Sequence, residues 1–337
     1  MAGTAVLCCL LAALAAAPIG AAAGVPRSRE FDFTYDVRLG ELPADARQVE
    51  VWLPYPTSDE HQEVTVTEVS SPSAYEVLIE PEYGNKILHL TLTEPQRSAI
   101  ALLMSVHVRR HEYLRDLAAP PARTPRLPPA GARWLEPDRR VPLDRRVRKL
   151  AREVTRGKKS DLAKARAIYD YVVGTMKYDK SGTGWGNGDI DWACDAKRGN
   201  CTDFHALFIG LARAVGIPAK FAIGFPIPLE RGEGEIGGYH CWAEFYLAGY
   251  GWVPVDASEA WKNPDKRDYF FGAHDENRVQ FTVGRDIVLN PRQAGEPLNY
   301  FIYPYVEVNG KPFADVTRSL RYKDSGARTA SRPAVAR

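Results

Sequence analysis

Two stretches of the sequence decide the fold: GNCTDFHALFIGLARAVGIPAKFAIGF at residues 199–225 and GYHCWAEFYLAGYGWVPVDAS at residues 238–258. In the first, Asn200 is a suitable N-cap, and apolar side chains recur at helical spacing until a Gly-Ile-Pro sequence ends the helix. The remaining residues form three strand-like runs, and a tight turn centred on Gly249 joins the last two. A helix followed by antiparallel strands predicts an α+β fold.

Three side chains with complementary chemistry lie on these elements. Cys201 is in the first turn of the predicted helix, where free backbone N–H groups and the helix dipole favour a thiolate. His240 opens one strand and Asp256 closes the next, and reflection about the turn places Asp256 opposite Trp242, on the pleat face of His240. This pattern predicts a nucleophile, a base and an orienting acid. The alternative is a core histidine and a strand-end aspartate.

The two stretches together resemble the transglutaminase-like superfamily, which has a papain-like cysteine-enzyme core. The family pattern combines Gly-x-Cys at a helix start, a small-Arg-x-x-Gly-Ile-Pro-x-Arg/Lys helix exit, a His-x-Trp strand and a Gly-Trp-x-x-x-Asp strand. It is matched at residues 199–201, 212–220, 240–242 and 251–256. The resemblance covers about residues 145–281. It implies that Cys201 attacks a carboxamide carbonyl, that His240 transfers the proton and that Asp256 orients His240. It leaves the acyl acceptor open.

Further residues are expected to support this triad. The backbone N–H of Cys201 is one expected oxyanion donor. Family transglutaminases carry a Trp upstream of the nucleophile, and the resemblance implies that Trp185 or Trp192 supplies the second. We favour Trp185, because its Gly-rich setting lets the indole N–H point freely; packing is the equal alternative. His205, one helical turn after the nucleophile, and Trp242 are expected to lie just behind the triad.

No metal or cofactor is expected. The residues Cys194, Cys201, His205, His240 and Cys241 lack metal-binding spacing, and the acids within 189–195 lack the spacing of a calcium loop. Cys241 follows His240 in a strand and should therefore point to the opposite face, into the core or into a disulfide with Cys194. The Gly-rich segment 231–238 is interpreted as a mobile flap beside the site.

The composition excludes a disordered or fibrous chain, because 26% of the 337 residues are charged and 45% are hydrophobic. Residues 109–159 hold 16 Lys/Arg against 6 Asp/Glu. We interpret this basic segment as a solvated linker and helix face. No nucleic-acid motif accompanies it, so contact with nucleic acid is not expected.

The rest of the chain divides where its composition changes. An uncharged N-terminal segment predicts a cleaved signal peptide (residues 1–23 or 1–24), or a retained membrane anchor. Alternating apolar and polar residues then predict an all-β, sandwich-like domain, and seven prolines mark a linker. Asp144 and Ser160 are expected to cap two helices. The predicted divisions are a signal peptide (1–24), a β-rich domain (25–115), a Pro-rich basic linker (116–142), a transglutaminase-like catalytic domain (143–285), a C-terminal β-extension (286–323) and a disordered tail (324–337).

We therefore predict an exported, bacterial-type enzyme, secreted or periplasmic, or anchored to the membrane if the signal is uncleaved. Its triad is expected to perform thiol-dependent acyl transfer on amide bonds, with a protein or peptide as the substrate. Hydrolysis of a peptide or isopeptide, such as a cell-wall peptide, is favoured. The alternatives are a protein-glutamine amine transferase that forms cross-links and a non-catalytic surface-binding module.

Overall fold

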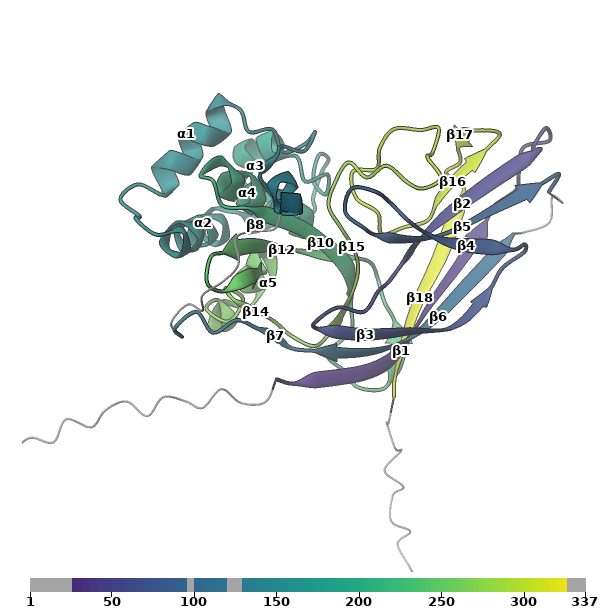
Figure 1. Ribbon diagram of the computed structural model, residues 1–337, viewed down its shortest axis with the longest axis horizontal. Coiled ribbons are helices and arrows are strands. Elements are labelled where there is room, and N and C mark those ends of the chain that lie inside the picture. Colours follow the sequence, from purple (N-terminus) through teal and green to yellow (C-terminus); the bar gives the residue numbers. More distant parts are fainter. Residues whose placement is uncertain (1–25, 96–99, 120–128, 326–337) are drawn as a thin grey trace, which may run out of the picture.

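The computed structural model describes residues 26–95, 100–119 and 129–325. The predicted signal peptide, residues 120–128 of the predicted linker and residues 326–337 of the predicted tail lie outside these ranges. Helices gather on one side of the molecule and long strands on the other (Figure 1). Within the described ranges, no helix is long and apolar enough to cross a membrane.

The strand-rich side contains two antiparallel sheets of five strands each. The first has the order β11 (Glu233–Glu235), β18 (Val316–Asp324), β1 (Ser28–Leu39), β6 (Ala101–His111) and β3 (Gln62–Ser70). The second has the order β17 (Lys311–Pro312), β16 (Tyr305–Val308), β2 (Gln48–Tyr55), β5 (Lys86–Thr93) and β4 (Tyr75–Ile79). Alternate residues of β1 are buried, as expected for a strand with one face on a core.

Strands from near the start and near the end of the described residues both contribute to this sandwich. β18 pairs with β1 from Phe31 opposite Asp324 to Leu39 opposite Val316, and β16 pairs with β2. The predicted C-terminal β-extension therefore supplies strands to the domain that begins the chain. The segment that forms the helical side is inserted between the first and last strands of the sandwich.

The helical side is built around one antiparallel sheet of four strands. Its sheet has the order β13 (Gly251–Val255), β12 (His240–Leu247), β10 (Ala219–Pro226) and β15 (Arg278–Val283). The helices are α1 (Arg145–Val154), α2 (Asp161–Thr175), α3 (Ile190–Ala196), α4 (Cys201–Ala214) and α5 (Ala257–Lys262), with the 3-10 helices η1 (Pro129–Leu135) and η2 (Pro264–Lys266). Short pairs join β7 (Tyr113–Leu114) to β14 (Ala273–His274) and β8 (Lys177–Tyr178) to β9 (Arg198–Gly199). These elements confirm the predicted α+β class.

Helix α4 is the central element of the helical side. All its residues from Cys201 to Arg213 are buried, because the other helices and the sheet surround it. The predicted N-caps are confirmed, since the side chains of Asp144, Ser160 and Asn200 accept hydrogen bonds from backbone N–H groups at the starts of α1, α2 and α4. The nucleophile candidate thus lies at the start of a rigid, enclosed helix.

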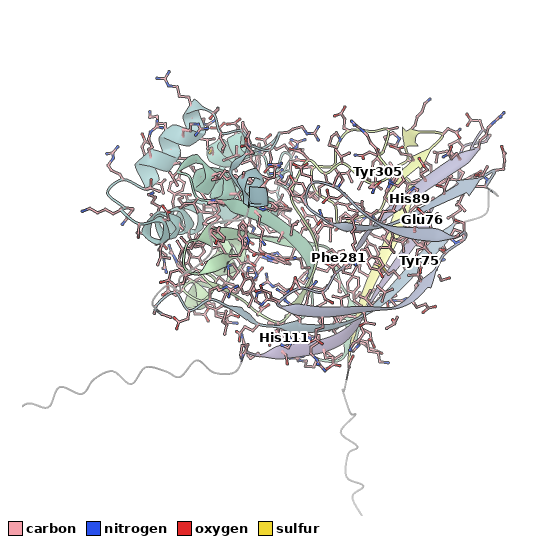
Figure 2. All side chains as sticks on the ribbon, in the orientation of Figure 1. Tyr75, Glu76, His89, His111, Phe281 and Tyr305 are labelled. Carbon is pink, nitrogen blue, oxygen red and sulfur yellow. The ribbon has the colours of Figure 1, made fainter. Side chains whose placement is uncertain are left out.

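Aromatic side chains join the sandwich to the helical side. Phe33 of β1 stacks on Phe225 of β10 at 5.2 Å between ring centroids, and Phe281 of β15 lies 5.5 Å from Phe33. Figure 2 shows Phe281 between the two halves of the molecule. Aromatic pairs of this kind contribute about 0.5–1.5 kcal/mol each beyond their buried area. The two halves therefore share one continuous core.

The Gly-rich segment 231–238 is not a free flap, and that expectation is wrong. β11 pairs with β18, the Ile236 N–H donates to the Leu320 carbonyl at 2.9 Å, and the Gly232 N–H donates to Asp324 at 2.8 Å. A Cβ at Gly234 would lie 3.2 Å from the Tyr322 ring, so a glycine suits this position of the edge strand. The segment is a fixed wall of the sandwich.

Candidate active site

The start of α4 is held by a capping box. The Asn200 side chain accepts from the Thr202 N–H at 2.9 Å, and the Asp203 carboxylate accepts from the Asn200 N–H at 3.0 Å. Gly199 has φ of 149°, and a Cβ there would lie 2.2 Å from an Asp203 oxygen. Only glycine fits this position. The Gly-x-Cys sequence therefore directs Cys201 into the first helical turn, where its side chain is 2% exposed.

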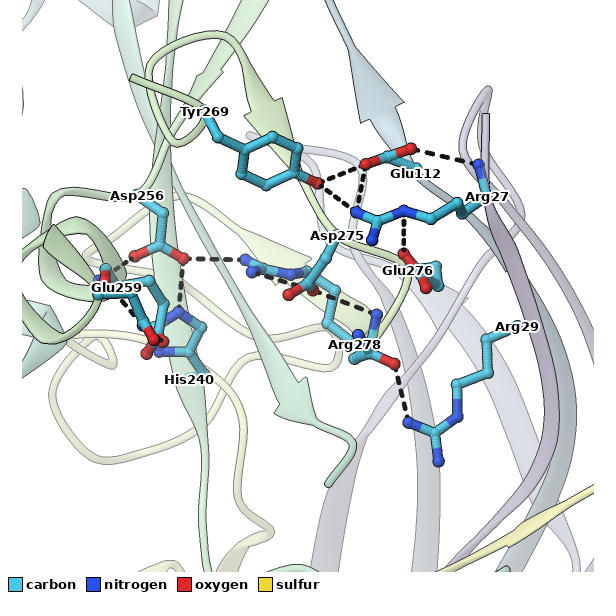
Figure 3. Close-up of polar contacts among 12 residues, drawn as sticks. Arg27, Arg29, Glu112, His240, Asp256, Glu259, Tyr269, Asp275, Glu276 and Arg278 are labelled. Carbon is cyan, nitrogen blue, oxygen red and sulfur yellow. Dashed lines mark hydrogen bonds and ion pairs between the residues drawn. The ribbon is translucent and has the colours of Figure 1, made fainter. Parts of the chain in front are cut away.

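His240 and Asp256 come together as the reflection about Gly249 predicts. β12 and β13 are in register from Leu247 opposite Gly251 to Ala243 opposite Val255, which brings Asp256 level with Trp242. His240 Nε2 lies 2.7 Å from Asp256 Oδ2, and both residues are buried (Figure 3). The bond to the carboxylate leaves Nδ1 as the ring nitrogen available to a thiol.

The Cys201 thiol is poised to ionise. Burial favours its neutral form, but hydrogen bonds with Cys241 and His240 and the charge of His240 outweigh burial and hold the pKa of Cys201 well below its usual value. Burial also favours a neutral His240 ring, yet the charge of Asp256 and the hydrogen bonds with Asp256 and Cys201 raise the pKa of His240 to about 10. The site thus favours a thiolate and imidazolium pair.

Asp256 is enclosed by donors on both oxygens. Oδ2 accepts from His240 and from Arg278 Nη1 at 3.0 Å, while Oδ1 accepts from the Ser258 hydroxyl at 3.1 Å and the Glu259 N–H at 3.0 Å. Burial opposes ionisation, but the positive charge of His240 and its hydrogen bond, followed by the charge of Arg278, hold the pKa of Asp256 well below its usual value. The carboxylate is fixed in orientation and in charge.

Sequence reasoning missed Arg278. The available signal was weak: one arginine opens the strand-like run RVQFTV, and such a residue is usually a solvated strand end. Its position beside Asp256 depends on the pairing of β15 with β10, which local spacing does not reveal.

His205 and Trp242 lie behind the triad. His205 Nε2 accepts from the Ala257 N–H at 3.1 Å and lies 3.7 Å from Asp256 Oδ1. Burial lowers the pKa of His205, so this imidazole is neutral near pH 7. Trp242 is fully buried, with the Arg278 guanidinium 4.9 Å from its ring centroid. Both side chains support the residues that face the thiol.

Trp185 does not fit the predicted oxyanion role. Its indole N–H donates to the Gly182 carbonyl at 3.0 Å, within its own loop, and Lys180 lies 5.9 Å from its ring centroid. The glycines that were expected to free the indole instead let the loop fold back onto it. Trp192 packs against Gly184, where a Cβ would lie 2.4 Å from the indole nitrogen.

Two tyrosines near the nucleophile were also missed. Burial and then the charge of Cys201 raise the pKa of Tyr178, to about 12, and the same two causes raise the pKa of Tyr239. The Tyr239 hydroxyl is engaged by Asn200 Nδ2 and the Thr202 hydroxyl, each at 3.0 Å. Among the described residues, no hydrogen bond involves the Tyr178 hydroxyl. Tyr239 thus braces the helix start, while Tyr178 has a free donor.

Cys194 and Cys241 are both free thiols, so of the two alternatives for Cys241 the structure favours the core over a disulfide. Cys194 lies on α3, near Arg146 and Asp191. Cys241 follows His240 in β12, and its Sγ lies 3.7 Å from the Thr202 hydroxyl at the start of α4. No group of three His, Cys, Asp or Glu within the described ranges could hold a metal ion.

A cavity of about 270 Å³ opens beside His240. Its apolar wall comes from the segment after β10 and from the fixed Gly-rich wall, and its polar wall comes from α5 and the loops that follow. The lining includes Ile227, Leu229, Ile236, Glu259, Lys266 and Asp275. Leu229 is 69% exposed and is the most exposed of the large apolar side chains that line this cavity.

Comparisons with known proteins cover both halves of the molecule. An uncharacterized protein of Haemophilus influenzae is 30% identical over 321 residues, which are 84% of this chain and 86% of that protein. The uncharacterized protein YebA of Bacillus subtilis is 26% identical over 136 residues, which are 36% of this chain and 18% of that protein. A solved protein of Cytophaga hutchinsonii, suggested to be a cysteine protease, has the same fold: its TM-score is 0.59 at 16% identity, with 89% of this chain and 98% of that chain covered.

The sequence profile of the transglutaminase-like superfamily matches residues 148–257, which run from α1 to the start of α5. This segment holds Cys201, His240 and Asp256, and its helix and strands have the expected arrangement. The chain therefore belongs to the transglutaminase-like superfamily.

Proposed function

We propose that this protein is a thiol-dependent enzyme that acts on amide bonds, with Cys201 as nucleophile, His240 as proton carrier and Asp256 as the acid that orients His240. The proposal is carried by the buried thiol at the start of α4, whose pKa His240 lowers, and by the 2.7 Å hydrogen bond between His240 and Asp256. Favoured substrates are peptides or isopeptides, with cell-wall peptides as one candidate class.

The proposed reaction has two halves. The Cys201 thiolate attacks the amide carbonyl, and His240 gives its proton to the leaving amine, so that a thioester forms and the C–N bond breaks. His240 then takes a proton from water, and the resulting hydroxide attacks the thioester. The acid product leaves, the thiolate is regenerated and His240 is again protonated. Asp256 remains ionised throughout.

The developing oxyanion needs two donors. The backbone N–H of Cys201, in the first turn of α4, supports one. The Tyr178 hydroxyl is our candidate for the second, because β8 places Tyr178 opposite Gly199, two residues before Cys201, and this hydroxyl makes no hydrogen bond to the described residues. Its free donor replaces the indole that was expected from Trp185.

Water is favoured over an amine as acyl acceptor. An amine acceptor carries a positive charge before it reacts, and an unpaired acid would guide it to the site. Both acids of the cavity beside His240 are already paired, Glu259 with Lys262 at 2.7 Å and Asp275 with Arg278 at 3.4 Å, and Lys266 adds a positive charge. Because the acids of the cavity are already paired and Lys266 adds a positive charge, the cavity disfavours a cationic amine, and with it the cross-linking alternative.

One experiment separates the candidate functions. A glutamine-containing peptide and a branched cell-wall peptide are incubated with the protein, with and without a labelled primary amine, and products are identified by mass spectrometry. Free acid without label incorporation supports hydrolysis, and label incorporation supports transfer. Cys201→Ala is the control and should form no product. Slow alkylation of Cys201 by iodoacetamide below pH 7 would instead support a non-catalytic binding module.

The N-terminal segment supports an exported location, secreted or periplasmic, with a membrane-anchored form as the alternative. Fractionation of cells that produce the full chain, combined with N-terminal sequencing of the mature protein, tests this. Cleavage near residue 23 is expected.

A further inference from the structure

The triad carboxylate has a partner from outside the segment that matches the superfamily profile. Arg278 is the first residue of β15, and its side chain is 3% exposed. Its Nη1 donates to Asp256 Oδ2 at 3.0 Å and its Nη2 to Asp275 Oδ1 at 3.4 Å (Figure 3). The centre of its guanidinium lies 4.9 Å from the Trp242 ring centroid. The guanidinium is therefore held from three sides.

Resting on the function proposed above, we propose that Arg278 is a positioning residue of this active site: it keeps Asp256 ionised and aimed at His240, so that His240 stays protonated opposite the Cys201 thiolate. Arg278 does not touch the reacting atoms. It acts through Asp256, whose Oδ2 it shares with His240.

A count of buried charge gives the physical reason. Cys201, His240, Asp256 and Arg278 are 2%, 6%, 0% and 3% exposed, so water compensates none of their charges well. In the reactive form, the thiolate and carboxylate carry two negative charges, and the imidazolium and guanidinium carry two positive charges. Removal of Arg278 leaves one uncompensated negative charge, which is relieved by protonation of the thiolate or of Asp256.

An arginine suits this task better than a second histidine or a lysine. Its guanidinium does not lose its proton in proteins, so the compensation is independent of pH. Its fork also reaches two acids at once while its flat face lies on Trp242. When His240 gives its proton to the leaving amine, Arg278 remains as the cation that keeps Asp256 charged.

The other groups around Arg278 do not replace it. His274 is buried and its pKa is lowered by burial, so it is neutral, as is His205. Arg110, from β6, adds positive charge at longer range. The remaining nearby acids, Asp275 and Glu259, have side chains that are 21% and 24% exposed, so water screens them more than it screens Asp256.

The test uses Arg278→Met, which removes the charge at similar length, and Arg278→Lys, which keeps it. Arg285→Lys is the matched control, because Arg285 is also buried (1%) but bonds to the carbonyls of Asn187 and Gly188 and to Asn299. For each full-length variant, the rate of Cys201 alkylation by iodoacetamide is measured from about pH 3 to pH 9, together with the thermal unfolding midpoint.

Arg278→Met should move the alkylation midpoint upward by at least about one pH unit, a tenfold loss of thiolate at low pH. Arg278→Lys should restore most of this shift, and Arg285→Lys should leave the midpoint unchanged even if the unfolding temperature falls. An unchanged midpoint in folded Arg278→Met, or an equal shift in Arg285→Lys, would overturn the inference. If Arg278→Met does not fold, Arg278→Gln takes its place with the same expectation. A wild-type thiol that titrates near its ordinary value would instead refute the proposed function itself.

Discussion

At the scale of single residues, the nucleophile is controlled by the groups that touch its sulfur. Against burial, the interactions with Cys241 and His240 lower the pKa of Cys201. Burial and the interaction with Cys201 hold the pKa of Cys241 well above its usual value, so Cys241 stays a neutral thiol. A neutral thiol can donate its S–H to the thiolate, which explains why a second cysteine stabilises the first one's charge.

Substitution of Cys241 by Ala should raise the pKa of Cys201, because the thiolate loses a hydrogen-bond donor in a buried setting. We expect a shift of about one unit, measured by the pH dependence of iodoacetamide alkylation. Cys241→Ser, which keeps a donor, is the control and should shift less. A Cys241→Ala thiol that titrates as low as the wild type would exclude this role.

The pH profile of kcat/KM should be a broad bell. Its acid limb reports Cys201, whose pKa is depressed, so activity rises as the thiolate forms at low pH. Its alkaline limb reports His240, whose pKa is about 10, so activity falls when the ring loses the proton meant for the leaving amine. An activity that first rises above pH 8 would contradict the thiolate and imidazolium pair.

Tyr178→Phe should lower kcat by about a hundredfold and leave KM nearly unchanged, because an oxyanion donor acts mainly in the transition state. Steady-state kinetics on a hydrolysed peptide provide the measurement. Tyr171→Phe, on α2 near Cys194, is the control and should behave as the wild type. Equal losses in both variants would point to a general structural effect.

At the scale of elements, the start of α4 depends on one buried carboxylate. Besides closing the capping box, Asp203 accepts from the Gly186 N–H at 2.7 Å and the Gly188 N–H at 3.0 Å. It therefore fastens the loop before α3 to the helix that bears the nucleophile. Loss of this anchor affects both the helix start and the loop.

Asp203→Ala should lower the free energy of unfolding by about 2–3 kcal/mol, because three backbone donors lose a buried partner. Cys201 alkylation should also slow at low pH, since the helix start loosens. Asp161→Ala is the control: Asp161 is a first-turn acid of α2 that pairs with Lys164 at the surface. Chemical denaturation measures the stability, and equal losses for the two variants would contradict the anchoring role.

Some features of the elements could be predicted from the sequence, and others could not. Helix caps and the β12–β13 register depend on residues close together in the chain, so spacing was sufficient to predict them. Arg278 and the pairing of β18 with β1 depend on contacts between distant segments, which no local pattern reveals. Trp185 failed for another reason: a donor in a Gly-rich loop found an acceptor three residues away.

At the scale of the whole molecule, a buried ion pair ties the sandwich to the catalytic half. Arg29 of β1 binds both oxygens of Asp324 of β18, at 2.8 and 3.0 Å, and also donates to the Pro228 carbonyl at 2.6 Å and to Asn277 at 2.9 Å. The last two acceptors belong to segments beside the His240 cavity. The sandwich thereby sets the shape of that cavity.

Asp324→Asn should cost about 3 kcal/mol at pH 7, because it leaves Arg29 buried without its counter-charge. Burial opposes ionisation of Asp324, but the Arg29 and Gly232 hydrogen bonds lower its pKa overall. This stability is present above the pKa of an unfolded aspartate and is lost as pH falls through the lower, folded value. The difference from wild type should therefore shrink in acid, as followed by urea unfolding; a constant difference would argue against the ion pair.

The inserted position of the catalytic segment has a consequence for synthesis. A ribosome makes Cys201, His240 and Asp256 well before it makes β18, yet β18 holds β11 and, through Asp324, the neighbouring carbonyls that shape the cavity. A nascent or truncated chain therefore carries the reactive thiol without a finished substrate pocket. Such a fragment should react with small alkylating agents but should not hold a peptide in the cavity.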